Sequence, residues 1–284
     1  MRRILATGAV FVVVVVGATA GVIALLGRDD VVPVRALCSA TLEGTQWHLE
    51  PDQAETTALL AGTALRRGLP ARALTIAIAT GLQESKLRNI AHGDRDSVGI
   101  FQQRPSQGWG SPEQIMDPVY STNAFYDALV EVDGYSDLPI TEAAQAVQRS
   151  GFPEAYAQHE SWARAWASAM YGYSSAAVTC TLPAADGPAD PEAVVVRAQR
   201  DLGLTALPAA VGLMVDGAAF AAGAPDAVGR VGWAVAHWGV SVAAPLGITQ
   251  VRVAGLQWDR DDGAWAAAAG DPLPDGQVLL TLAE

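Results

Sequence analysis

The side chains best suited to catalysis lie between Gln83 and Pro105, directly after an apolar segment. Glu84 falls at the C-terminal end of that segment, which is predicted to be a helix over residues 71–85. Partial burial and the negative end of a helix dipole both disfavour a carboxylate, so both raise the pKa of Glu84. A carboxylic acid that keeps its proton near neutral pH can donate that proton to a glycosidic oxygen. We therefore treat Glu84 as a candidate general acid; the competing interpretation is a solvated surface glutamate.

Two more carboxylates follow within a predicted turn. Asp94 and Asp96 stand in the run Gly-Asp-Arg-Asp, and the segment 92–104 is the only strand-like stretch of its region, with a short strand predicted at 98–103. A hairpin here would place both side chains opposite Glu84. Glycosidases with two carboxylates hold them about 5–9.5 Å apart, so Asp94 and Asp96 are candidates for a second carboxylate. The alternative is that this run is simply a polar turn.

Helices are predicted on both sides of this turn. Apolar spacing predicts helices over residues 53–67 and 71–85, and Ser111-Pro112-Glu113 and Asp117-Pro118 are typical helix starts. Further helices are expected from Thr141 toward Arg149 and from Pro153 toward Met170. The candidate acid and the turn would therefore lie in a mainly helical environment.

The two cysteines of the chain, Cys38 and Cys180, bracket this helical region. In an exported protein an even number of cysteines favours a disulfide, which here would tie together the two ends of one domain. Two buried free thiols are the alternative. A catalytic cysteine is disfavoured because no histidine lies near either residue in the sequence.

The N-terminal segment predicts export. An uncharged run of 24 residues, 4–27, follows Arg2 and Arg3 and is long enough to span a bilayer. The arginines before it place the N-terminus in the cytoplasm and the bulk of the chain outside the membrane. The alternative is a cleaved signal peptide, for which Ala18-Thr19-Ala20 has the pattern of a cleavage site. Both interpretations put the rest of the chain outside the cytoplasm.

The chain divides into three predicted parts. Residues 1–35 comprise the cytoplasmic tip, the anchor and a linker, 36–182 form the domain bracketed by the cysteines, and 183–284 form a small α+β unit after a Pro/Gly/Asp-rich linker. In this last part helices are expected after Asp190 and over 226–243, and strands at 248–253, around Gln257 and at 278–282, with a hairpin turn at Asp262-Gly263. Its four tryptophans form either a binding face or a core, and they are Trp233, Trp238, Trp258 and Trp265. The predicted fold class is α+β.

The net charge argues against nucleic acid as a partner. The chain carries 18 basic and 30 acidic side chains, a net charge of −12, whereas duplex binding needs a basic surface. A mildly acidic exported protein suits a neutral carbohydrate or a cationic partner better. The four histidines lack the spacing of metal ligands, and no phosphate-binding or dinucleotide-binding motif is present, so neither a metal nor a cofactor is expected.

The pair Glu84-Ser85, followed by Gly99-Ile-Phe-Gln102, resembles the lysozyme-like superfamily of lytic transglycosylases. In that family a Glu-Ser pair ends a helix, and a Gly-Leu-Met-Gln-type strand follows at this spacing in a hairpin that forms one wall of the glycan cleft. The runs Gly-Asp-Arg-Asp-Ser and Phe-Gln-Gln-Arg-Pro-Ser-Gln-Gly-Trp-Gly are also similar to a group of exported actinobacterial proteins with a lysozyme-like domain. The resemblance covers about 100–140 of the 284 residues.

The resemblance implies roles for individual residues. Glu84 matches the catalytic acid/base, Ser85 the residue that orients it, and Gly99 and Gln102 the strand glycine and the cleft glutamine. Independently of the resemblance, Gln103 and Arg104 either contact substrate or only close the hairpin, and Trp109 either stacks on a sugar ring or packs on the core as a loop aromatic. The family carries a tyrosine near its catalytic glutamate on a later helix, and Gln148 stands at the matching position here.

The implied reaction is cleavage of the MurNAc–GlcNAc β-1,4 bond of peptidoglycan. Attack by the sugar's own 6-hydroxyl would give a 1,6-anhydro product, as in a lytic transglycosylase, whereas attack by water would make the protein a muramidase. Because Gln148 departs from the family pattern, a catalytically inactive glycan-binding or scaffold protein of the cell envelope is the alternative. Residues 183–284 are a candidate surface for an envelope protein partner.

Overall fold

A computed structural model describes residues 35–149, 153–221 and 224–284, and residues 35–284 form one compact unit. The described residues mix helix and sheet, 47% and 18%, which confirms the α+β class. The predicted cytoplasmic tip and anchor lie outside the described residues. Among the residues that are described, no helix is both long and apolar enough to cross a membrane.

The unit begins with a three-stranded antiparallel sheet of order β2-β1-β3, in which a tight turn at Glu43-Gly44 connects β1 to β2. Its strands are β1 (Leu37–Leu42), β2 (Thr45–Leu49) and β3 (Val178–Thr181). Cys38 and Cys180 are directly opposed in the β1–β3 ladder and form the predicted disulfide. The prediction that 92–104 is the only strand-like stretch of this region is wrong, because all three strands lie elsewhere.

Most helices between Cys38 and Cys180 begin within two residues of their predicted starts. They are α2 (Pro51–Arg66), α3 (Ala71–Ser85), α4 (Pro112–Met116), α5 (Pro118–Val130), α6 (Ile140–Gln148) and α7 (Glu160–Met170). Ser111 caps α4 and Asp117 caps α5 through their side-chain oxygens, as expected from their positions before proline. The helix predicted from Pro153 is instead a 3-10 helix over Pro153–His159 that leads into α7.

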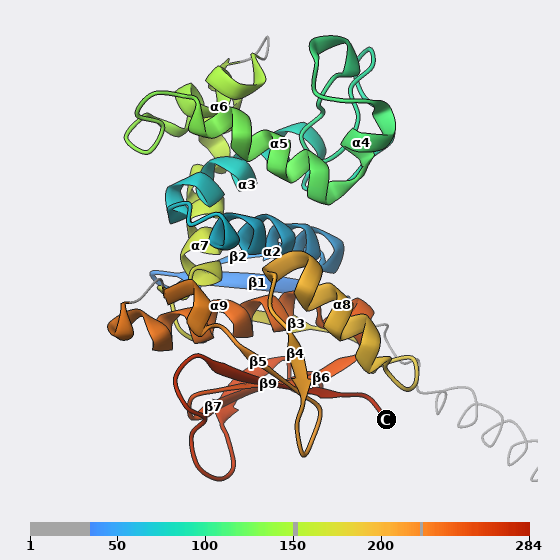
Figure 1. The fold of residues 1–284 in the computed structure, drawn as a ribbon, viewed down its shortest axis with the longest axis vertical. Helices are drawn as coiled ribbons and strands as arrows, with labels where there is room; N and C mark the ends of the chain where they lie inside the picture. The colour runs from blue at the N-terminus through green and yellow to red at the C-terminus, as the bar shows by residue number, and fades with distance from the viewer. Residues whose placement is uncertain (1–34, 150–152, 222–223) are drawn as a thin grey trace, which may run out of the picture. The chain divides into compact units, whose positions relative to one another are not determined.

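The central helix of this part is α3. Its residues from Ala73 to Leu82 are all buried, and it packs against α2, α6, α7 and the 3-10 helix Pro153–His159. Figure 1 shows α3 between α2 and the elements α5 and α6. The C-terminal end of α3 is therefore held from several sides by segments that are distant in sequence.

The strand predicted at 98–103 is also wrong. The segment forms tight turns, closed by a single antiparallel bridge between Val98 and Gln103. Gly99 has φ 83° and Gln102 has φ 49°, values that an extended strand excludes. The expected hairpin is thus a compact turn.

Residues 183–284, called the second part below, contain a six-stranded antiparallel sheet of order β4-β5-β9-β6-β7-β8. Its strands are β4 (Ala206–Pro208), β5 (Leu213–Asp216), β6 (Ile248–Val253), β7 (Leu256–Asp259), β8 (Ala264–Ala267) and β9 (Gln277–Leu282), and its helices are α8 (Pro191–Leu202), α9 (Val228–Ser241) and α10 (Ala243–Leu246). The Asp262-Gly263 turn joins β7 to β8, as predicted. In Figure 1, α9 lies between this sheet and the helices α2 and α7, and it contacts all three.

Buried polar groups join the two parts. His237 on α9 is fully buried; its Nδ1 lies 2.7 Å from the carbonyl oxygen of Ala169, and its Nε2 lies 3.1 Å from the amide nitrogen of Ala177. Asp201 on α8 is also fully buried, and the carbonyl oxygen of Asp201 packs so closely on Gly62 of α2 that a Cβ there would lie 2.4 Å away. The separation into domains at residues 182 and 183 stays a prediction.

Candidate functional site

Glu84 lies in the last turn of α3, where the buried body of the helix meets the surface. Its side chain is half-buried, whereas the preceding helix residues, such as Ile78 and Leu82, are buried. The sequence of α3 alone explains this position, because it places one carboxylate directly beyond a continuous buried stretch. Glu84 therefore meets the first requirement of a general acid, which is partial removal from water.

A tyrosine from a distant segment contacts this carboxyl group. The hydroxyl of Tyr156, on the 3-10 helix Pro153–His159, donates a 2.7 Å hydrogen bond to Oε1 of Glu84, and the Tyr156 side chain is fully buried. Burial raises the pKa of Glu84, and the hydrogen bonds from Tyr156 and Gln148 oppose that rise. The net result is a raised pKa. The Glu84 carboxyl group therefore has a higher proton affinity than an ordinary surface glutamate.

Gln148 ends α6 and lies directly at this site. Its Nε2 donates a 2.7 Å hydrogen bond to the carbonyl oxygen of Phe101, and its amide also bonds to Glu84. Gln148 thus links the candidate acid to the turn at 99–103. The resemblance to lytic transglycosylases implies a tyrosine at this position, and the structure places the hydroxyl of Tyr156 on Glu84 instead.

Sequence reasoning missed Tyr156. Tyr156 lies eight residues after Gln148, in a segment that the sequence predicts to be an ordinary helix. One signal is present in the sequence: Tyr156 is the first tyrosine after Gln148. Helical periodicity alone cannot assign a contact with Glu84 to it.

The turn after α3 is attached to Glu84's own helix by Ser85. The Ser85 hydroxyl donates a 2.7 Å hydrogen bond to the carbonyl oxygen of Ile100. Gly99 is required in this turn, because a Cβ there would lie 3.0 Å from the carbonyl oxygen of Ile115 at an already unfavourable φ. The Gln102 side chain bonds back to the Gly99 carbonyl oxygen at 3.2 Å, so both predicted cleft residues shape the turn.

Gln103 holds the turn from inside. Its side chain is buried, and its Nε2 donates a 3.1 Å hydrogen bond to the carbonyl oxygen of Ser121 on α5. The amide oxygen of Gln103 is buried without a hydrogen-bond partner. These contacts fasten the turn to α5 and give Gln103 a structural contact in addition to its predicted role.

Asp96 is engaged by its own loop. Its carboxylate accepts hydrogen bonds from the backbone and hydroxyl of Ser106, at 2.8 and 3.0 Å, and from Nε of Arg104 at 3.0 Å. These bonds, those from Ser106 first, hold the pKa of Asp96 well below its ordinary value. Asp96 and Arg104 therefore form an ionised pair that closes the loop. Asp94 is exposed to solvent and lies 3.8 Å from Arg95.

A groove of about 530 Å³ lies beside Gln148. Trp109 lines it together with polar residues, which include Gln107, Glu131, Gln148 and Arg149. The groove combines a partly buried indole with amide and charged groups, a composition that suits a sugar with both a flat apolar face and hydroxyl groups. The structure thus brings the predicted residues Trp109 and Gln148 to one concave surface. Glu84 does not line this groove, and Gln148 is the residue that contacts both the groove and the Glu84 carboxyl group.

The tryptophans of the second part serve packing. Trp238 and Trp258 are fully buried, and Trp233 and Trp265 pack partly buried against the core. Trp258 and Trp265 donate hydrogen bonds to Thr179 and to the carbonyl oxygen of Val178, so they join β7 and β8 to β3. The core interpretation explains these four residues without a sugar-binding face.

The residues that the structure describes contain no cluster of three or more histidine, cysteine or acidic side chains able to hold a metal ion. Comparison with known proteins adds no assignment to this geometry: no protein-family model matches the chain, and no curated protein matches it.

Proposed function

We propose that this protein is a peptidoglycan-cleaving enzyme that acts on the MurNAc–GlcNAc β-1,4 bond, with Glu84 as its single general acid and base. The observation that carries the proposal is the half-buried Glu84 carboxyl group, which has a raised pKa and a 2.7 Å hydrogen bond from Tyr156. The family resemblance of the Glu84-Ser85 and Gly99–Gln102 motifs supplies the substrate class.

The surroundings of Glu84 suit both halves of such a reaction. Burial raises the pKa of the carboxyl group and so favours the protonated form, which can donate its proton to the leaving glycosidic oxygen. Once the proton has left, the donors from Tyr156 and Gln148 stabilise the carboxylate that remains. Glu84 can then act as the base toward the attacking hydroxyl group.

The attacking group in this proposal is the sugar's own 6-hydroxyl. A mechanism with two carboxylates needs a second free group about 5–9.5 Å from the first. Of the two candidates for that group, Asp96 is already bound to Ser106 and Arg104, and Asp94 is exposed to solvent beside Arg95. The single-carboxylate mechanism of the resembled lytic transglycosylases is therefore the one we propose. The expected product is therefore a 1,6-anhydro sugar, and a muramidase reaction with water is the alternative.

The proposed location is the outer side of the cell membrane. The apolar run at 4–27 acts as a single anchor with a cytoplasmic N-terminus, or as a signal peptide that is removed. The Cys38–Cys180 disulfide is in accord with an oxidising extracytoplasmic compartment. In the groove, Trp109 is the proposed platform for a sugar ring of the glycan strand.

A non-catalytic envelope protein that binds glycan strands is the second candidate. It is favoured by one observation: Gln148 stands where the resembled family has its tyrosine. In this case the groove and Trp109 would still bind glycan, but Glu84 would have no reaction to catalyse.

Digestion of purified peptidoglycan by the full chain in detergent separates these candidates. The matched variants are Glu84→Gln and Glu142→Gln, the latter an exposed glutamate of α6. Mass spectrometry should find anhydro-muropeptides with the unaltered chain and with Glu142→Gln, and a loss of about 10²-fold or more with Glu84→Gln. Reducing-end products would identify a muramidase. Glycan binding without products would establish the second candidate.

A further inference from the structure

Immediately after Glu84 the backbone turns through two consecutive residues in the left-handed conformation. Lys86 has φ 57° and Leu87 has φ 60°, and neither is glycine. Non-glycine residues hold this conformation only where surrounding contacts enforce it, and such positions cluster at functional sites. Leu87 is fully buried, and a side chain at Gly81 would collide with it, since a Cβ there would lie 2.7 Å from Leu87 Cδ2. The end of α3 is therefore a constrained turn that needs external support.

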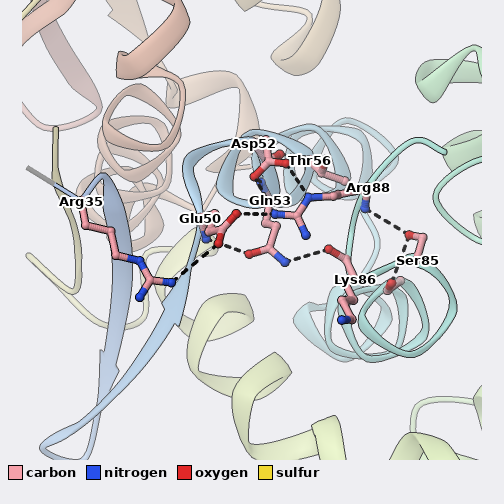
Figure 2. A network of polar contacts seen from close by, with 9 residues as sticks. Arg35, Glu50, Asp52, Gln53, Thr56, Ser85, Lys86 and Arg88 are labelled. Atoms are coloured by element: carbon pink, nitrogen blue, oxygen red, sulfur yellow. Dashed lines mark hydrogen bonds and ion pairs between the residues drawn. The ribbon is translucent and has the colours of Figure 1, made fainter. Parts of the chain in front are cut away.

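A network from the start of α2 supplies that support, and Figure 2 shows its residues. Nε of Arg88 lies 2.7 Å from Asp52, and Nη2 of Arg88 lies 2.5 Å from Glu50. Gln53 adds a second connection, because its side-chain amide donates a 2.9 Å hydrogen bond to the carbonyl oxygen of Lys86. Glu50 precedes α2, and Asp52 and Gln53 lie in the first turn of α2. The start of one helix therefore binds the segment after α3 at two places, Lys86 and Arg88.

Arg88 is also connected to the residue that follows Glu84. The backbone N–H of Arg88 donates a 3.1 Å hydrogen bond to the Ser85 hydroxyl, which in turn donates to the carbonyl oxygen of Ile100. Ser85 directly follows Glu84. The hydrogen bonds therefore run from α2 to Arg88, from Arg88 to Ser85, and from Ser85 to the 99–103 turn. Glu84 is the sequence neighbour of Ser85 and lies beside this series of hydrogen bonds.

Neighbouring charges favour this arrangement. The single guanidinium faces two carboxylates, and its bond to Asp52 is the first cause that raises the pKa of Arg88 above its usual value. A fork-shaped guanidinium can bind two carboxylates from different backbone positions at once, whereas an ammonium group binds as a point charge. The chemistry of this position therefore selects arginine.

We propose that Arg88, clamped by Glu50 and Asp52, is a positioning residue that fixes the direction of the Glu84 carboxyl group toward Tyr156 and Gln148. Arg88 acts through Ser85 and the backbone, not by contact with substrate. As a positioning role it rests on the proposed function of Glu84, but its structural effect on Glu84 can be measured without turnover.

The test compares Arg88→Ala, Arg88→Lys and a matched control in the full chain in detergent. The control is Arg67→Ala, which removes another arginine–carboxylate pair, the 2.7 Å contact with Asp127, from the opposite end of α2. We expect Arg88→Ala to lower kcat about 10-fold with less than about a 2-fold change in KM, because misplacement of a reacting group lowers the rate of the chemical step. Arg88→Lys should restore part of kcat, and Arg67→Ala should leave kcat within about 2-fold of the unaltered chain.

A second readout does not depend on activity. The Glu84 carboxyl carbon is followed by NMR over pH in ¹³C-glutamate-labelled protein, with Glu84→Gln to assign the signal. Arg88→Ala should raise the Glu84 midpoint by about half a pH unit, because looser bonds from Tyr156 and Gln148 stabilise the carboxylate less, and Arg67→Ala should not. An unchanged or lowered midpoint in Arg88→Ala overturns the positioning role, whatever the activity. A raised midpoint in a chain that cleaves no glycan supports the positioning role and counts against the proposed function alone.

Discussion

The hydroxyl oxygen of Tyr156 lies 2.7 Å from Oε1 of Glu84, although 72 residues separate the two in sequence. This contact joins the end of α3 to the 3-10 helix Pro153–His159 and gives a half-buried carboxyl group one defined donor. It has two consequences: the carboxyl group is oriented, and its proton affinity is set by burial against hydrogen bonding. The candidate chemistry of the protein depends on this pair.

Removal of the Tyr156 hydroxyl should raise the pKa of Glu84 further. In Tyr156→Phe the carboxylate loses a donor while its burial is retained, so its charged form becomes less favourable. A general acid works while it is protonated, and the high-pH limb of the kcat–pH profile should therefore move to higher pH. The measurement is that profile, together with the NMR titration of Glu84.

The control for this prediction is Tyr126→Phe. Tyr126 is also fully buried, and its hydroxyl donates a 3.0 Å hydrogen bond to the carbonyl oxygen of Leu60. Its loss should lower stability by about 1 kcal/mol, the net worth of a buried hydrogen bond, without any shift in the Glu84 titration. An equal shift in both variants would show that Tyr156 has no specific effect.

The disulfide should contribute strongly to stability. Cys38 and Cys180 are 142 residues apart, and closing so long a loop restricts the unfolded chain. The double variant Cys38→Ala/Cys180→Ala should lose about 2–5 kcal/mol of unfolding free energy in urea denaturation. A loss below about 0.5 kcal/mol would mean that the β1–β3 pairing holds the chain ends without the covalent bond.

Acid should destabilise the protein through His237. Burial lowers the pKa of His237 to about 4, from an ordinary value near 6.5. The unfolded chain therefore takes up a proton at this residue below pH about 6.5 while the folded chain does not, so folding stability falls as the pH drops from about 6.5 toward about 4. The loss is a few kcal/mol at most, since one pKa unit corresponds to about 1.4 kcal/mol.

The hydrogen bonds of His237 give the same direction. Its Nε2 accepts from the amide of Ala177 and therefore has no room for a second proton. In folded protein the imidazole NMR signal of His237 should stay in its neutral form down to pH about 5. Titration of His237 near pH 6.5 in the folded state would contradict this prediction.

Asp201 should be needed to join α8 to the rest of the fold. Its fully buried carboxylate accepts from Nε of Arg197 and Nε of Arg200, both at 2.7 Å, and from Nε1 of Trp238 at 3.1 Å. Asp201→Ala leaves these donors without their acceptor, and it should cost about 3–5 kcal/mol in urea denaturation. Asp127→Ala removes an exposed pair and should cost less than about 1 kcal/mol. A similar loss of unfolding free energy in both variants would contradict the prediction that the buried Asp201 network stabilises the fold.

The helices of the first part could be predicted because their signals are local. Ser111 and Asp117 cap the helices that begin at the prolines after them, and the predicted helix over 71–85 has the same bounds as α3. A cap and an apolar periodicity act within one or two turns of chain, so neighbouring residues are sufficient to specify them. The same reasoning placed Glu84 at the end of a buried helix.

The strands show where this local reasoning fails. The 98–103 segment has the composition of a strand, but Gly99 and Gln102 both adopt positive φ. Gly99 is held there by a hydrogen bond to the carbonyl oxygen of Ile90 and by close packing on Ile115. In contrast, β1 is the central strand of its sheet: it pairs with β2 through a local turn and with β3 about 140 residues later. A ladder between distant segments has no signature in either segment alone.

The sequence by itself thus determined the α+β class, most helix starts, the cysteine pair and the position of Glu84 on its helix. The tertiary structure decided which groups surround that carboxyl group: Tyr156 and Gln148 as its donors, and Arg88 with Glu50 and Asp52 behind it. It also decided that Asp96 binds Ser106 and Arg104. The physical reason is that helix formation depends on neighbours a few residues away, whereas the proton affinity of a carboxyl group depends on burial and donors that only the folded chain assembles.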